Sequence, residues 1–246
     1  MNTSGKDVSL RTKKRQMMKY TTLLFDLDGT LVDSGEGIMR CAQYALAHMG
    51  IQVEDYHTLR AFVGPPLEDS FKDFYGMTGP EAQEAVLAYR ERYFPIGIYE
   101  QTLYPGVLEM LDRLKEAGYS MAIATSKMNS QADRVVKELF PELSVRLDAV
   151  FGRDDAGLLH TKADVIQDGL RQLGQPDRCS LLMIGDRKFD IIGARQCGID
   201  SLGVLYGYGH REELAAAGAT YICKDFDDML QLLAPMDTVG QGIRNA

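Results

Sequence analysis

The sequence has few cysteines and lacks the paired spacing that a zinc site needs. Its four cysteines, Cys41, Cys179, Cys197 and Cys223, are scattered through 246 residues without a C-x-x-C pair. This scatter argues against structural zinc and favours free thiols in a reducing compartment. The chain also lacks any run near the ~20 apolar residues that a membrane-spanning helix needs. We therefore expect a cytoplasmic protein with no membrane partner.

The sequence also has fewer basic than acidic residues. The chain carries 27 Lys and Arg against 35 Asp and Glu, a formal net charge of -8. An acidic protein repels polyanions, so DNA and RNA polymers are excluded as partners. The glycines at 203, 207 and 209 lack the G-x-G-x-x-G spacing of a dinucleotide site. An anionic small molecule must then be bound by local positive charge, a metal or backbone N–H groups.

The sequence predicts a tail without regular structure at each end of the chain. Residues 1–19 are polar and basic, and no apolar segment follows them, so they do not form a secretory signal. We expect this tail to be disordered and the C-terminal residues 236–246 to be loose. The sequence is compatible with a monomer or a homodimer.

The central part of the chain alternates between short β-prone runs and helical patterns. The expected strands lie at 20–25, 119–124, 149–151, 181–184 and 201–205. The helical patterns between them lie at 107–117, 131–139, 162–173 and 189–197. This alternation predicts an α/β fold, a doubly wound parallel sheet with helices on both faces.

One region interrupts the alternation. Between about residues 35 and 104 the sequence shows helical patterns and no convincing strand. The patterns lie at 37–49, 58–62, 67–75 and 80–94. We expect a helical insertion at 35–104, with the catalytic core formed by residues 20–34 and 105–235.

Carboxylates follow two of the expected strands. Asp26 and Asp28 follow the first strand, and Asp186 and Asp190 follow the fourth. In a parallel sheet the carboxyl ends of the strands form the ligand site. Carboxylates gathered there would repel each other unless a cation lies between them, and oxygen ligands suit Mg²⁺. The sequence thus predicts Asp26, Asp28, Asp186 and Asp190 as metal ligands.

Groups that bind phosphate follow the other strands. Thr125 and Ser126 offer hydroxyls, and Lys162 offers an ammonium at the start of a helix. Lys127 competes with Lys162 for the phosphate-facing role, and we favour Lys162. Such a set suits phosphoryl transfer, in which a carboxylate such as Asp26 can attack phosphorus.

These motifs resemble the haloacid dehalogenase superfamily of hydrolases. The resemblance rests on Asp26-Leu27-Asp28-Gly29-Thr30, Thr125-Ser126, Lys162 and Gly185-Asp186-Arg187-Lys188-Phe189-Asp190. It implies a Rossmann-like core, with Asp26 as nucleophile and Asp28 as acid and base. It also implies a Mg²⁺ bound by Asp26, the carbonyl of Asp28 and Asp186, with Asp190 supporting the metal shell.

The insertion resembles the α-helical cap of the phosphoglycolate phosphatase-like subgroup. The segments 60–67 and 203–209 look most similar to bacterial 5′-nucleotidases. Arg60 is a candidate substrate contact, with a plain surface charge as the alternative. The double proline at 65–66 and the Tyr-Gly-Tyr-Gly segment at 206–209 are expected to be loop features without a part in the chemistry.

The resulting hypothesis is a Mg²⁺-dependent phosphomonoesterase that acts on a small phosphorylated metabolite, with a nucleoside 5′-monophosphate or phosphoglycolate as leading substrates. A phosphosugar mutase would keep Asp28 and remains an alternative. A dehalogenase would need neither Asp28 nor Mg²⁺, and a phosphonatase would be expected to use a cap lysine. A non-enzymatic binding protein is disfavoured because every catalytic group is present.

Overall fold

A six-stranded parallel sheet forms the centre of the protein. The computed structural model describes residues 19–154 and 158–234. The strand order is β5-β4-β1-β6-β7-β8. The strands are β1 (Thr22–Phe25), β4 (Ser120–Met128), β5 (Ala149–Arg153), β6 (Leu181–Gly185), β7 (Asp200–Val204) and β8 (Tyr221–Cys223). The order runs outwards in both directions from β1, as a doubly wound sheet requires.

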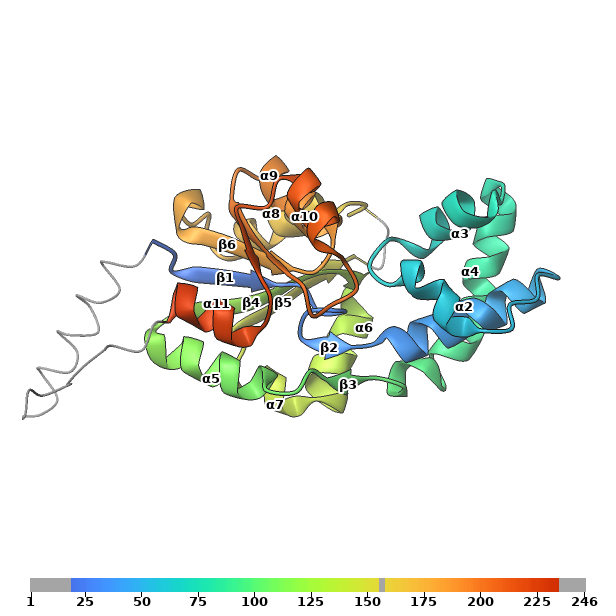
Figure 1. Ribbon diagram of the computed structural model, residues 1–246, viewed down its shortest axis with the longest axis horizontal. Coiled ribbons are helices and arrows are strands. Elements are labelled where there is room, and N and C mark those ends of the chain that lie inside the picture. Colours follow the sequence, from blue (N-terminus) through green and yellow to red (C-terminus); the bar gives the residue numbers. More distant parts are fainter. Residues whose placement is uncertain (1–18, 155–157, 235–246) are drawn as a thin grey trace, which may run out of the picture.

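Helices cover both faces of this sheet because its central strands are apolar on both sides. In β1, Leu23 and Phe25 belong to one core cluster and Leu24, between them, belongs to the other. The first face packs against α5 (Val107–Ala117) and α11 (Phe226–Leu233), and the second against α8 (Lys162–Gln172) and α9 (Lys188–Gln196). Figure 1 shows these two helix layers below and above the strands. The remaining helices of this part are α6 (Asn129–Arg134), the π-helical turn Val135–Leu139, α7 (Pro141–Ser144), the 3₁₀ turn Arg178–Ser180 and α10 (Arg211–Ala217).

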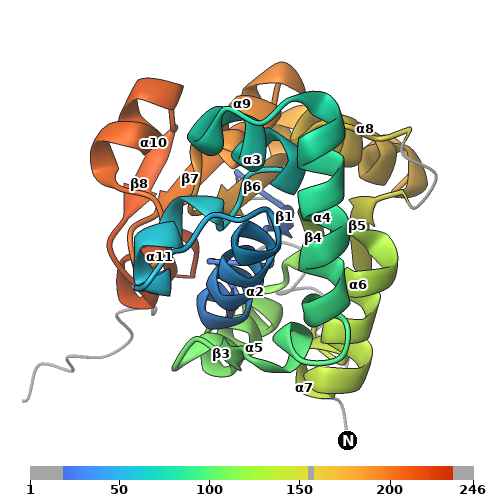
Figure 2. The ribbon, with the colours of Figure 1, turned by 90° about the vertical axis from the view of Figure 1, so that its right-hand side faces the viewer.

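A separate helical unit is inserted after β1 and stands against one end of the sheet (Figure 2). Its helices are α2 (Gly35–His48), the 3₁₀ helix Tyr56–Phe62, α3 (Leu67–Tyr75), α4 (Gly79–Tyr93) and the 3₁₀ turn Gly97–Tyr99. Helix α4 starts at a capping box of Thr78 and Glu81, with Pro80 in its first turn. The unit joins the sheet domain through a short antiparallel pair, β2 (Val32–Asp33) and β3 (Thr102–Leu103).

The predicted doubly wound sheet with a helical insertion is confirmed. The prediction missed β8, which is only three residues long and lies at the edge of the sheet. It also missed the two-residue strands β2 and β3, which are too short for a periodic pattern. The tail expected at 1–19, apart from Lys19, and the tail expected at 236–246 lie outside the described residues.

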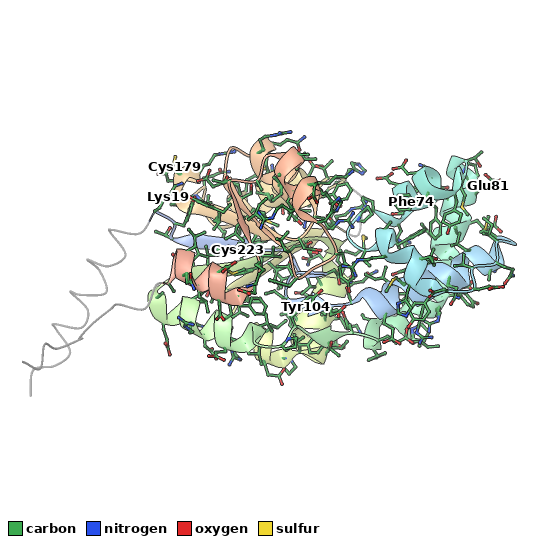
Figure 3. All side chains as sticks on the ribbon, viewed as in Figure 1. Lys19, Phe74, Glu81, Tyr104, Cys179 and Cys223 are labelled. Carbon is green, nitrogen blue, oxygen red and sulfur yellow. The ribbon has the colours of Figure 1, made fainter. Side chains whose placement is uncertain are left out.

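The four cysteines are free, as the sequence predicted. Cys41, Cys197 and Cys223 are buried, and Cys179 is exposed. Figure 3 places Cys179 and Lys19 on the sheet domain at the end remote from the insertion, which carries Phe74 and Glu81. Within 19–154 and 158–234, no helix is long and apolar enough to cross a membrane.

Candidate active site

The first two carboxylates meet because their strands are neighbours. β1 and β6 pair in parallel with Phe25 opposite Ile184, so the chain leaves both strands at the same edge of the sheet. Asp26 follows β1, and Asp186 follows Gly185 at the end of β6. Asp190, in the first turn of α9, brings an oxygen to the same place. Single oxygens of Asp26, Asp186 and Asp190 all lie within 4.8 Å of one another, and all three residues are buried.

Lys162 reaches this group from the first position of α8. The helix begins there because Thr161 and Asp164 form a capping box, with Asp164 N donating to Thr161 Oγ1 at 3.2 Å. Lys162 Nζ lies 2.9 Å from Asp26 Oδ1 and 2.8 Å from Asp190 Oδ1. Burial alone would lower the pKa of Lys162, but these two carboxylates raise it, so the lysine stays a cation.

The electrostatics of the carboxylates fit a dication. Burial raises the pKa of Asp26 to about 6 against the opposing effect of Lys162. Burial and then the charges of Asp190 and Asp26 raise the pKa of Asp186 to about 8. Asp186 also accepts hydrogen bonds from Tyr208 N at 2.8 Å and from the hydroxyl of Thr30 at 3.3 Å, which fix its orientation. A close set of buried oxygen donors with excess negative charge is the environment that Mg²⁺ prefers.

Asp28 is held apart from this group by the second lysine. Lys127 Nζ lies 2.8 Å from Asp28 Oδ2 and donates to the hydroxyl of Tyr93 at 2.8 Å. Asp28 Oδ1 is buried and has no hydrogen-bond partner among the described residues. The two lysines that the sequence offered for the phosphate-facing role thus pair with different carboxylates. Lys162 contacts Asp26 and Asp190, and Lys127 contacts Asp28.

Glycines allow other backbone segments to approach Asp186. Gly29 has a φ of +86°, and a Cβ built there would lie 2.4 Å from a carboxylate oxygen of Asp186. A Cβ at Gly207 would lie 2.4 Å from both the Asp186 Cβ and the Gly29 carbonyl oxygen. The loop 206–209, expected to have no part in the chemistry, therefore packs directly on a metal-ligand candidate. Tyr208, the loop residue next to Gly207, donates a backbone hydrogen bond to Asp186.

A cavity of about 360 Å³ opens above these groups. Asp26, Asp28, Thr125 and Ser126 line its floor, together with Lys127. Asp186, Asp190 and Lys162 are buried beneath the floor. The insertion supplies the roof, which consists of Ile38, Phe62, Gly64, Pro65, Pro66, Leu67, Glu68, Asp69, Val86, Tyr89, Arg90 and Tyr93.

Arg60 is placed elsewhere. Its guanidinium donates to the carbonyl of Gly207 at 2.8 Å and lies 4.6 Å from the ring centroid of Tyr208. It lines a different cavity, with Tyr56 and Tyr104, and is not among the residues around Asp26. In this structure Arg60 contacts the sheet domain instead of the space above the candidate nucleophile.

Sequence reasoning did not identify several residues that surround the cavity. Tyr89, Arg90 and Tyr93 lie on α4, while Arg153 ends β5 and His160 precedes α8. The spacing of Tyr89 and Tyr93 put both on one face of the predicted helix. That spacing is equally typical of a helix packed inside its own domain, so it could not distinguish a roof from a core.

Comparison with known proteins agrees with this geometry. Residues 23–204 match the family described as haloacid dehalogenase-like hydrolase. A 5′-nucleotidase of Pseudomonas aeruginosa is 38% identical over 217 residues, which cover 88% of this chain and 96% of that protein. Tyrosine-protein kinase PtkA of Mycobacterium tuberculosis is 34% identical over 201 residues, covering 81% of this chain and 67% of that protein. The crystal structure of a predicted phosphatase from Clostridium acetobutylicum has a TM-score of 0.82 at 39% identity, covering 87% of this chain and 97% of that one.

Proposed function

The chain belongs to the haloacid dehalogenase-like hydrolase family, and from that premise we propose that it is a Mg²⁺-dependent phosphomonoesterase that works through an aspartyl-phosphate on Asp26. Its relatives include a 5′-nucleotidase and phosphatases, and the chain is a phosphoric monoester hydrolase. The observation that carries the finer proposal is the buried group of Asp26, Asp186 and Asp190 with Lys162 bridging two of its members.

Asp26, Asp186 and Asp190 would hold the cation, together with the backbone carbonyl of Asp28. When bound, Mg²⁺ would supply charge to the phosphate oxygens and reduce their repulsion of the attacking carboxylate. Lys162, already against Asp26, adds a second positive charge on the same side. Thr125 and Ser126, on the cavity floor, would donate hydrogen bonds to phosphate oxygens.

In the first step, a carboxylate oxygen of Asp26 attacks phosphorus and the bond from phosphorus to the ester oxygen breaks. Asp28, which lines the same cavity, transfers its carboxyl proton to the departing oxygen, so the product is a neutral alcohol. Asp28 is then a carboxylate, and the adjacent Lys127 stabilises that charge.

In the second step, water attacks the phosphorus of the aspartyl-phosphate. Asp28 takes a proton from this water, and the bond between phosphorus and the Asp26 oxygen breaks. Inorganic phosphate leaves, and Asp26 returns to a carboxylate while Asp28 regains its proton. One residue can serve as acid and then as base because the alcohol leaves before water arrives.

The roof favours a nucleoside 5′-monophosphate over phosphoglycolate as the substrate. The helical insertion, residues 35–104, would act as a cap that encloses it. A volume of about 360 Å³ lies within the roughly 300–1,000 Å³ that is typical of small-molecule sites. Phosphoglycolate carries only a carboxymethyl group and would leave most of this space filled with water. A nucleoside would reach the apolar residues of the roof, such as Phe62 and Val86, and the guanidinium of Arg90.

A phosphate-release screen with and without Mg²⁺ tests the proposal. The panel contains nucleoside 5′-monophosphates, phosphoglycolate and sugar phosphates. We expect Mg²⁺-dependent release of inorganic phosphate, with the highest kcat/KM for a nucleoside 5′-monophosphate. No release from any member would contradict the phosphatase assignment. Phosphate that appears on a second sugar hydroxyl instead of in water would favour the mutase.

A further inference from the structure

Lys127 is a buried cation whose position is fixed by two partners from different parts of the molecule. It lies near the end of β4, and its side chain is only 6% exposed. On the sheet side, its Nζ lies 2.8 Å from Asp28 Oδ2. On the insertion side, it donates to the hydroxyl of Tyr93 at 2.8 Å. A buried ammonium without such partners would pay a large desolvation cost, so these contacts determine where it sits.

The two carboxylate oxygens of Asp28 differ in their contacts, because Lys127 binds only one of them. Oδ2 is held by the ammonium, whereas Oδ1 is buried without a hydrogen-bond partner among the described residues. A buried carboxylate oxygen without a partner is costly in a folded protein, and such atoms are found at catalytic positions. The lysine therefore holds one oxygen of Asp28 and leaves the other without a polar contact among the described residues.

Tyr93 brings the insertion into this arrangement. It is the last residue of α4 and is 3% exposed. Its ring stacks on Tyr89, one turn earlier, with centroids 5.4 Å apart and planes at 21°. A packed helix therefore holds the hydroxyl of Tyr93 next to Lys127. The row of contacts from Tyr93 to Lys127 to Asp28 links the insertion to the sheet domain.

We propose that Lys127 and Tyr93 are positioning residues for proton transfer by Asp28, and that the arrangement is complete only when the insertion covers the sheet edge. The proposal rests on the proposed function, because it assigns a role relative to Asp28 as acid and base. Neither residue needs to touch the substrate. Their effect passes through the orientation of Asp28 and through the charge that remains on it after proton transfer.

This role predicts that the loss of kcat/KM in the variants depends on the leaving group of the substrate. In the first step of the proposed reaction, the ester oxygen departs with the proton of Asp28. A p-nitrophenolate can depart without that proton, whereas the alkoxide of benzyl phosphate cannot. The two phosphates are similar in shape, so recognition by the cavity affects them alike. The value of kcat/KM reports the steps up to departure of the alcohol, whereas kcat also includes attack by water.

The experiment compares kcat/KM for benzyl phosphate and p-nitrophenyl phosphate in Lys127→Met and Tyr93→Phe. General acid catalysis contributes roughly 10²–10⁴-fold, so loss of positioning in Lys127→Met should cost benzyl phosphate about tenfold more than p-nitrophenyl phosphate. Tyr93→Phe should shift the same ratio in the same direction by a smaller factor, about two- to fivefold. Lys72→Met and Tyr44→Phe are matched controls on the insertion, because neither side chain lines the cavity around Asp26.

A cycle with Asp28→Asn separates failure of this proposal from failure of the proposed function. Asp28→Asn must itself penalise benzyl phosphate selectively; an equal loss for both substrates would reject Asp28 as the acid. If Asp28→Asn is selective, adding Lys127→Met should leave the substrate ratio unchanged, because the lysine acts through Asp28. The double variant also removes both charges of the buried pair, which guards against misfolding from an unpaired carboxylate.

Two results would overturn the proposal. One is an equal loss for both phosphates in Lys127→Met, which would indicate direct phosphate binding or a structural role. The other is a further selective loss when Lys127→Met is added to Asp28→Asn. An unchanged substrate ratio in Tyr93→Phe would overturn the second part of the proposal, that Tyr93 and the insertion help to position Asp28.

Discussion

The floor and the roof of the cavity differ in how charge is placed. The floor and the layer beneath it contain Asp26, Asp186, Asp190 and Lys162, all buried and all supported by the parallel sheet and its helices. The roof is largely apolar and comes from one helical insertion. Buried charges must be fixed by partners, so the floor tolerates little change, whereas apolar surfaces of suitable volume tolerate exchange. Under the proposed function, the floor would carry out the chemistry and the roof would select the substrate.

A small number of polar contacts join the two regions. Lys127 contacts Tyr93, Arg60 contacts Gly207, and Arg187 donates to the carbonyl of Val63. In addition, the backbone N–H of Gly35 donates to the hydroxyl of Tyr208, and Arg134 donates to the hydroxyl of Tyr99. The backbone connection consists of the pair β2 and β3, each two residues long. One buried apolar cluster also contains residues of both regions, such as Phe25 and Phe62. The roof is thus joined to the floor by continuous apolar packing as well as by these polar contacts.

The largest expected effect comes from a matched pair of substitutions in the floor and the roof. Asp26→Asn should reduce kcat for p-nitrophenyl phosphate by roughly 10⁴-fold or more, because the amide cannot attack phosphorus. Asp69→Asn changes an exposed roof residue of the same cavity. We expect it to change KM by less than about threefold and to leave kcat nearly unchanged. Comparable losses of kcat in both variants would contradict the claim that the floor residues carry out the chemistry and the roof residues do not.

The next effect concerns the metal and pH. The folded protein raises the pKa of Asp186 from 3.8 to about 8, so the folded state binds more protons than the unfolded state between these values. Without Mg²⁺, stability should therefore be highest at low pH in this window and fall as pH rises towards 8. Mg²⁺ replaces the proton, so its stabilising effect should be larger at pH 8 than at pH 6.

Thermal unfolding at both pH values, with EDTA or with Mg²⁺, measures this difference. Saturation at 100-fold above Kd contributes about 2.7 kcal/mol, a shift of roughly 5–10 °C for a chain of this size. Asp186→Asn should abolish the shift, and EDTA should abolish turnover of the unaltered protein. An identical Mg²⁺ shift at pH 6 and pH 8 would show that no proton leaves the carboxylates on binding.

The smallest expected effect tests the contacts between floor and roof. Arg60→Ala removes a part-buried charged hydrogen bond to Gly207 and the cation–π contact with Tyr208, together worth about 1 kcal/mol. We expect kcat/KM to fall by roughly three- to tenfold, and by the same factor for every substrate, because Arg60 contacts protein. Arg40→Ala is the control, since Arg40 pairs with Glu36 and stacks on Tyr56 within the insertion. Losses that differ among substrates would restore Arg60 as a substrate contact.

The sequence predicted the elements well where patterns were long. The helix expected at 107–117 has the observed bounds Val107–Ala117, and the four helical patterns of the insertion all correspond to helices. Single short segments were harder. The edge strand Tyr221–Cys223 has only three residues, so neither alternation nor length distinguishes it from a loop.

The candidate residues of the floor could be found from the sequence because each follows a strand, lies in the last residues of one or opens a helix. A parallel sheet places the carboxyl ends of its strands at one edge, so local order along the chain was enough to gather Asp26, Thr125 and Asp186. Lys162 was identified for the same reason. The separate partner of Lys127 was not, because Lys127 and Asp28 are far apart in the sequence and only strand pairing brings them together.

The sequence by itself determined the fold class and the set of charged groups at the sheet edge, because both follow from short-range patterns and from the geometry of parallel strands. Only the tertiary structure decided which lysine serves which carboxylate, that Arg60 contacts Gly207, and that Tyr93 reaches the site. The first outcome depends on how the strands and helices of the sheet domain pack together, and the other two depend on how the insertion is seated on the sheet. That seating depends on packing and a few polar contacts between distant residues, which no local pattern records.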